Sequence, residues 1–95
     1  MEIYQLRTFV TVAKLGHITK AAETLHVTQP AVTGHIKALE QELGIALFDR
    51  SHGRIALSKD GELLLPEVER TLSAFNATLA KAKEIKGEIT GRVLI

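Results

Sequence analysis

The residues best suited to bind a ligand lie between Thr28 and Gln41, and they are polar side chains with no catalytic partner nearby. On a helix that turns about 100° per residue, Pro30, Thr33, Gly34, Lys37 and Gln41 share one face. That face carries one charge, one hydroxyl and a glycine, which suits contact with a groove better than packing against protein. Gln29, at the start of the same segment, can pair with adenine through two hydrogen bonds.

Each of these residues also has an ordinary structural explanation. Gln29 could simply cap the helix, but Thr28 already supplies a cap, so we favour contact with DNA. The Thr33 hydroxyl could bond back to the carbonyl of Gln29, and both explanations stay open. Gly34 could lie deep in a major groove or merely face solvent beside the DNA, and these two explanations also stay open. Lysines such as Lys37 are solvated surface residues in most proteins.

The sequence offers no catalytic constellation and no metal site. His26, His35 and His52 lack the spacing of helical zinc ligands. Glu40 and Glu42 have no candidate nucleophile or base beside them. The chain contains no cysteine, which excludes a disulfide framework and a cysteine-based zinc site. We therefore expect neither an enzyme nor a bound cofactor.

Residues 19–43 must position the polar face, and their pattern predicts two helices joined by a tight turn. Thr19 is the expected N-cap of the first helix, which carries the small or apolar residues Ala21, Ala22 and Leu25. The pattern breaks at 26–28, after which Thr28 caps a second helix with Pro30 in its first turn. Its buried stripe is expected to comprise Val32, Ile36, Leu39 and Leu43. This arrangement is a helix-turn-helix.

A helix on one side and a hairpin on the other complete the predicted fold. Residues 2–15 predict an amphipathic helix that ends at Gly16, with Leu6, Phe9, Val10 and Ala13 on its apolar face. Gly44 ends the second helix of the pair, and Ile45 can fold back onto Leu39 as in a Schellman turn. Residues 47–57 then predict two short strands around a polar tip. Near that tip lie three basic or titratable residues, Arg50, His52 and Arg54. Most such hairpins are solvated surface, but directly after a helix-turn-helix this one is interpreted as a wing.

Ser58 can cap a long final helix that continues to about Ile85, and Pro66 should kink or restart it. Apolar residues alternate by three and four along this helix, namely Leu65, Val68, Leu72, Phe75, Leu79 and Ala82. This seam could only cover the first three helices. However, a helix of roughly 40 Å overruns so small a body, so we favour self-association.

Length and charge limit the remaining possibilities. Ninety-five residues suffice for one small domain. The formal net charge is only +1, below what DNA-binding domains usually carry, so a few placed cations and two cooperating copies would be needed. No apolar run reaches the length of a membrane span, and Met1-Glu2-Ile3 does not open a signal peptide. We expect a cytoplasmic protein that does not contact membranes.

Two segments, TKAAETLHVTQPAV and LEQELGIALFDR, together resemble the amino-terminal domain of LysR-type transcriptional regulators. The resemblance covers nearly the whole chain and also includes RIALSKDGELLLP. It implies a mainly α-helical, winged helix-turn-helix fold, with three core helices, a two-stranded wing and a long linker helix. It further implies dimers through antiparallel linker helices, tetramers of the full-length protein, and an interrupted palindrome as the DNA site. A small-molecule effector is expected only in a further, effector-binding domain.

The resemblance also assigns roles by position. Base contacts fall to Gln29, Pro30, Thr33 and Gly34, and phosphate contacts to Thr19, Lys20, Thr28 and Lys37. Arg50, His52 and Arg54 of the wing would lie at the minor groove, and the seam from Leu65 to Ala82 would form the dimer interface. Three residues depart from the family pattern: His17 replaces a frequent Ser, Gly34 a longer side chain, and Gly53 a frequent Arg. The last two reduce the number of direct contacts with DNA.

The sequence thus predicts a winged helix-turn-helix over 1–58, a dimerisation helix over 59–86, and a hinge with the start of a missing domain over 87–95. The predicted function is sequence-specific binding of double-stranded DNA by a bacterial transcription regulator. Helix 28–43 would enter the major groove, with wing 47–57 at the minor groove. The alternative is a winged-helix module that binds another protein.

Overall fold

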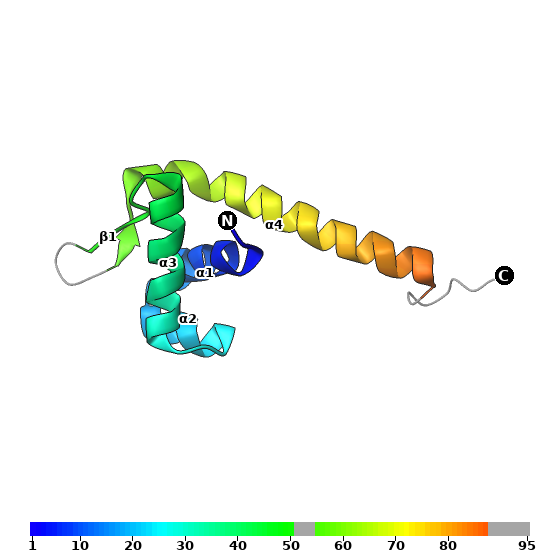
Figure 1. Cartoon of the computed structure of the whole chain (residues 1–95), viewed down its shortest axis with the longest axis horizontal. Coiled ribbons are helices and arrows are strands. Elements are labelled where there is room, and N and C mark those ends of the chain that lie inside the picture. The colour runs from blue at the N-terminus through cyan, green and yellow to red at the C-terminus, as the bar shows by residue number, and fades with distance from the viewer. Residues whose placement is uncertain (51–54, 88–95) are drawn as a thin grey trace.

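The computed structural model describes residues 1–50 and 55–87 (Figure 1). Within this part of the chain, three helices are followed by a two-stranded sheet and a fourth, longer helix. The elements, in chain order, are α1 (Ile3–Leu15), α2 (Ile18–Leu25), α3 (Gln29–Leu43), β1 (Phe48–Asp49), β2 (Ala56–Leu57) and α4 (Lys59–Lys86). The predicted order of elements is therefore confirmed.

Local capping signals account for most of the helix ends. The Thr28 hydroxyl accepts a hydrogen bond from the Ala31 N–H at 3.2 Å, and Pro30 lies in the first turn of α3. At the other end of α3, Gly44 adopts a left-handed conformation with φ of 75° and donates to the Glu40 carbonyl at 2.8 Å. This single bond corresponds to the simpler αL ending rather than the expected Schellman turn.

The start of α2 differs from the prediction. Its N-cap is His17, whose backbone is extended, and no side chain caps this helix. Thr19 is already the second helical residue, so its assignment as the cap is wrong. The reason is that Ile18 packs against the core, which draws the helix start forward to the first apolar residue after Gly16. Ala21 and Ala22 are buried as expected.

α1 forms the centre of the core, since α2, α3 and α4 all pack against it. For this reason its buried residues extend beyond the predicted apolar face: Val12 and Thr8 are buried, whereas Val10 and Ala13 are only half-buried. From α3, Val32, Ile36 and Leu39 enter the core as predicted. Leu43 does not, because it is the last residue of α3 at the edge of the core and is 37% exposed.

The predicted wing is an antiparallel pair in which Phe48 faces Leu57 and Asp49 faces Ala56. Phe48 is buried and meets Phe9 edge to face, with ring centroids 5.6 Å apart, so β1 is anchored to α1. Arg50 follows β1 and is exposed. His52 and Arg54, also assigned to the wing, lie outside the described residues.

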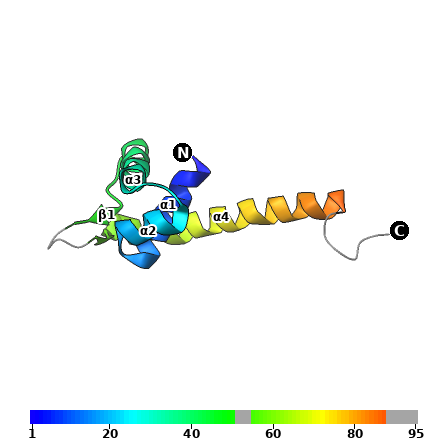
Figure 2. The same cartoon turned by 90° about the horizontal axis from the view of Figure 1, so that it is seen from below.

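α4 contains 28 residues and runs through Pro66 without a break, so the predicted restart is wrong. Pro66 removes the hydrogen bond that its N–H would give to the carbonyl of Glu62. Both residues are exposed, and water can satisfy that carbonyl instead. Figures 1 and 2 show that the later part of α4 projects away from the other helices.

The apolar seam of α4 therefore divides into two halves. Leu65, Val68 and Leu72 belong to the core or pack against it. Phe75 lies under the Arg7 guanidinium, 5.4 Å from the ring centroid, which ties α4 to α1. Leu79 is 48% exposed and Ala82 is also exposed. The seam thus covers the first three helices in its first half only.

Candidate nucleic-acid interface

The outward face of α3 is a polar surface whose opposite side is the hydrophobic core. Pro30, Gly34, Lys37 and Gln41 are exposed, and Thr33 is half-exposed. Because Val32, Ile36 and Leu39 fix the opposite side of the helix in the core, this face cannot turn inward. The structure thus brings these predicted residues together on one accessible surface.

Two ordinary explanations for the polar residues of α3 are not observed. Thr8, Thr71 and Thr78 each donate a hydrogen bond to the carbonyl four residues earlier. In contrast, the Thr33 hydroxyl has no hydrogen bond to any described residue. Gln29 is exposed and does not cap the helix, since Thr28 does so. Both side chains are therefore available to a ligand.

The first turn of α2 offers a second polar feature. Because no side chain caps this helix, the N–H groups of its first turn lack a side-chain partner. The exposed side chains of Thr19 and Lys20 lie in the same turn. Outward N–H groups, a hydroxyl and an ammonium group together suit an anion such as phosphate. Thr19 thus keeps its predicted location in the site although it is not the cap.

The cations of the chain fall into two groups. Lys14, Arg70 and Lys81 form ion pairs with Glu69, Glu67 and Glu84. Lys20, Lys37 and Arg50 have no acidic partner within residues 1–50 and 55–87, and the same holds for Lys59 and Lys83 on α4. Three unneutralised cations therefore lie on α2, on α3 and after β1, where the DNA contacts were predicted.

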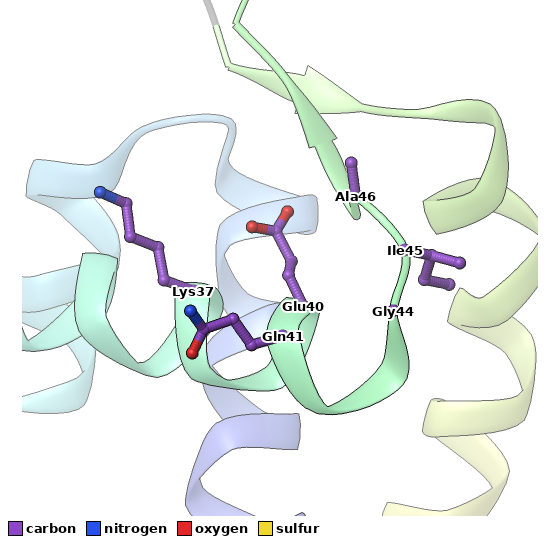
Figure 3. Close-up of a pocket in the computed structure, with 6 residues that line it drawn as sticks. All are labelled: Lys37, Glu40, Gln41, Gly44, Ile45 and Ala46. Carbon is purple, nitrogen blue, oxygen red and sulfur yellow. The ribbon is translucent and has the colours of Figure 1, made fainter.

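A hollow lies at the end of α3, lined by Lys37, Glu40, Gln41, Gly44, Ile45 and Ala46. Figure 3 shows that the Glu40 carboxylate points toward the segment entering β1, whereas the Lys37 side chain points away from it. The Glu40 carboxylate accepts the Leu47 N–H at 2.7 Å. Glu40 thus has a structural partner, and Lys37 remains free to meet an anion.

Among the histidines, His35 has a structural role. The Thr8 hydroxyl donates to the Tyr4 carbonyl at 2.9 Å and lies 2.9 Å from His35 Nδ1. Because a hydroxyl has one hydrogen, Nδ1 must carry the proton of the second bond. The Tyr4 ring packs edge-on against His35 at 4.7 Å. His35 therefore holds α3 against α1, and the described residues contain no group of three or more potential metal ligands.

Three residues at the junction of α3, the wing and α4 were not predicted as functionally relevant. Glu40 was considered only as a catalytic candidate, Ser58 only as a helix cap, and Gly61 not at all. Gly61 carried a signal, since a glycine in the first turns of a helix costs about 1 kcal/mol relative to alanine and often marks a close backbone approach. The Glu40 contact joins residues seven apart across a turn, so no local rule indicates it.

Comparisons with known proteins agree with this geometry. Residues 3–62 match the family described as bacterial regulatory helix-turn-helix proteins of the lysR family. An HTH-type transcriptional regulator from the ibpB-leuC intergenic region of Azotobacter vinelandii is 39% identical over 95 residues, which is all of this chain and 66% of the relative. The Bacillus subtilis regulator BsdA is 36% identical over 96 residues, covering all of this chain but 33% of BsdA. The chain thus spans only part of the length of these relatives.

The fold has the same relatives. A crystal structure of the DNA-binding domain of BenM with catB site 1 DNA superposes with a TM-score of 0.85 at 32% identity, covering 97% of this chain and all of the BenM domain. Within the described residues, no helix is long and apolar enough to cross a membrane. The chain therefore belongs to the lysR family of bacterial regulatory helix-turn-helix proteins and carries the winged helix-turn-helix DNA-binding domain of that family.

Proposed function

We propose that this chain binds specific sites on double-stranded DNA with α3 in the major groove, as the DNA-binding part of a dimeric regulator of transcription. The observation that carries the proposal is the face of α3 from Gln29 to Gln41. It is exposed and uncharged except for Lys37, and the core fixes the opposite side of the helix.

The residues of this face divide by chemistry into base and phosphate contacts. Gln29 can pair with adenine, while Pro30, Thr33 and Gly34 meet base edges or the thymine methyl group. Thr19, Lys20, Thr28 and Lys37 bind phosphates, which fixes the position of the protein without specifying sequence. The Thr28 hydroxyl accepts the Ala31 N–H and so keeps its own hydrogen to donate.

The wing contributes cations at the edge of the site. Arg50 is exposed and has no acidic partner among the described residues. Together with His52 and Arg54, it would lie at the minor groove, which attracts basic side chains where A·T-rich sequence narrows it. With Lys20 and Lys37, these residues give at most ~8 cationic contacts in a dimer, counting Arg but not His.

The remaining features concern the whole regulator. Two copies paired through α4 would bind an interrupted palindrome, and the full-length protein would form tetramers. A small-molecule effector would bind only to a further domain, so we expect neither enzymatic activity nor a cofactor in this chain. The site of action is the cytoplasm, where bacterial DNA lies.

A mobility-shift assay with labelled duplexes, selected for binding from a random pool, tests the function. Gln29→Ala should weaken the selected site by about 5- to 100-fold, because one bidentate base pair is worth about 1–3 kcal/mol, and should leave random DNA unchanged. The matched control is Asn76→Ala, another exposed amide, on α4. Absence of any shift, with or without competitor DNA, would favour the alternative function as a protein-binding module.

A further inference from the structure

We propose that Gly61 is a positioning residue that sets the direction of α4 relative to α3, and through it the spacing of the two α3 helices in a dimer. The proposal rests on the proposed function as a dimeric DNA-binding protein. Gly61 itself is not a DNA contact in this proposal. It acts by letting the first turn of α4 approach the strand of the wing.

The contact at Gly61 leaves no room for a side chain. Gly61 is buried, and a Cβ atom built on it would lie 2.2 Å from the Leu47 carbonyl oxygen. It would also lie 3.1 Å from Cδ2 of Leu57. The nearest atom belongs to the backbone, so no rotation of a side chain relieves the clash. Gly34, in contrast, has nothing within 4 Å of the corresponding position.

The Leu47 carbonyl cannot easily retreat, because hydrogen bonds hold both sides of its peptide. The Leu47 N–H donates to the Glu40 carboxylate at 2.7 Å, and the Leu47 carbonyl accepts the Ser58 N–H at 2.9 Å. The Ser58 hydroxyl donates to the Ala46 carbonyl at 2.6 Å and accepts the Gly61 N–H at 2.9 Å. These bonds join the end of α3, both strands of the wing and the start of α4 into one unit.

The length of α4 amplifies any displacement at this junction. To reach an ordinary contact of 3.4 Å, the first turn would have to move outward by about 1 Å. Val68 is buried and can act as the pivot, ~10 Å along the helix from Gly61, with Ala82 another ~21 Å beyond it. The far end of α4 would then swing by ~2 Å, and the swing applies to each copy in a dimer.

The experiment uses spin labels, for which the chain is suited because it contains no cysteine. Ala38→Cys on α3 and Ala80→Cys on α4 both change exposed positions. Labelled chains are diluted with unlabelled ones, so that electron–electron resonance reports the distance within one copy. We expect Gly61→Ala to shift this distance by ~2 Å, and Ser58→Ala to broaden its distribution because its hydroxyl no longer bridges Ala46 and Gly61. If Gly61→Ala does not fold, Ser58→Ala carries the test.

A stability-matched control separates position from folding. Val12→Ala removes buried atoms from α1, away from the junction, so it should lower the melting temperature without changing the distance. An equal shift in Val12→Ala, or identical distributions in wild type, Gly61→Ala and Ser58→Ala, would overturn the role of Gly61.

DNA duplexes then test the consequence for spacing. Single half-sites, and pairs of half-sites separated by increasing numbers of base pairs, are compared for wild type and Gly61→Ala. We expect single-site affinity within twofold of wild type and a changed preferred spacing for pairs. An unchanged spacing would overturn the link to dimer geometry. If no protein binds DNA while the label distance still shifts, the proposed function fails and the junction role stands.

Discussion

A glycine can lie within a helix for opposite reasons, and this chain contains both cases. At Gly34 an added Cβ meets nothing within 4 Å, and the residue is exposed on α3. At Gly61 the same atom would meet the backbone of Leu47 at 2.2 Å. The free domain therefore gives a reason for glycine at position 61 only. At position 34 any reason must come from a ligand.

The two glycines give a matched test of stability. Gly34→Ala should raise the free energy of unfolding by up to about 1 kcal/mol, because alanine is the better helix former and nothing obstructs its methyl group. Gly61→Ala should lower it despite the same gain in propensity, because the methyl group clashes with the backbone. Melting temperatures of the two variants decide the point. Equal changes in both would contradict the difference in packing.

Gly34 is also expected to affect specificity. Gly34→Arg should add nonspecific affinity through phosphates and lower the ratio of cognate to random binding, because a long side chain keeps α3 from the base edges. Competition binding with cognate and random duplexes measures this ratio. If Gly34→Ala and Gly34→Arg both keep the wild-type ratio, Gly34 faces solvent beside the DNA and close approach at this position is wrong.

Lys37 should bind a phosphate of the DNA backbone. Lys37→Gln is expected to weaken all DNA sequences alike and to flatten the slope of log affinity against log salt by roughly one unit for each lysine–phosphate pair that the substitution removes from a subunit. The wild-type slope should be no steeper than about −7. Lys83→Gln, at an exposed lysine in the last turn of α4, is the control. A weakening confined to one cognate base would mean that Lys37 contacts a base.

Among the elements, those governed by local rules were predictable from the sequence. Thr28, Ser58 and Gly44 mark helix ends through contacts within four residues, and each occurs where expected. The prediction at Thr19 was wrong because packing of Ile18 outweighs a capping preference worth about 1 kcal/mol. Capping and periodicity describe neighbours in sequence, so they miss contacts made across a turn.

The same distinction applies to the candidate site. The outward face of α3 follows from helical periodicity and was predictable residue by residue. The junction of Glu40, Ser58 and Gly61 depends on how three elements meet, and only the folded chain shows it. The wing belongs to both cases, since its strands were predictable but its attachment to α3 was not.

Glu40 provides a test of this attachment. Glu40→Ala should lower the free energy of unfolding by about 1–3 kcal/mol, because the Leu47 N–H loses its acceptor in a half-buried setting. Glu40→Gln keeps a carbonyl oxygen at the same distance and should retain most of the stability. Urea unfolding of both variants gives the comparison. If alanine and glutamine cost the same, the charge of Glu40 matters rather than its bond to Leu47.

At the scale of the whole molecule, α4 serves two surfaces in succession. Its first half contributes Gly61, Val68 and Leu72 to the core or to its edge, whereas Leu79 and Ala82 have no packing partner in the part of the chain described. Substitutions at Leu72 or Phe75 would therefore disturb the fold as well as any dimer. The distal residues test dimerisation without this complication.

Leu79→Glu combined with Ala82→Glu should convert dimers into monomers that keep the fold of α1, α2 and α3, because the new charges lie on the distal seam alone. Sedimentation velocity measures the mass, and circular dichroism checks the helix content. Leu63→Glu is the control, since Leu63 is 70% exposed and lies on the opposite side of α4. A dimer that survives the double substitution would rule out the distal seam as the interface.

The sharing of one core by α4 and the helix-turn-helix has a consequence for dosage. If two copies pair along the distal seam, pairing also stabilises the part that contacts DNA, since Val68 and Phe9 belong to the same buried cluster. Dilution would then remove DNA-binding protein in two ways, through fewer pairs and through less stable single copies. Occupancy of a DNA site would fall more steeply than in proportion to the amount of protein. A cell could thus switch such a site with a modest change in the number of copies it makes.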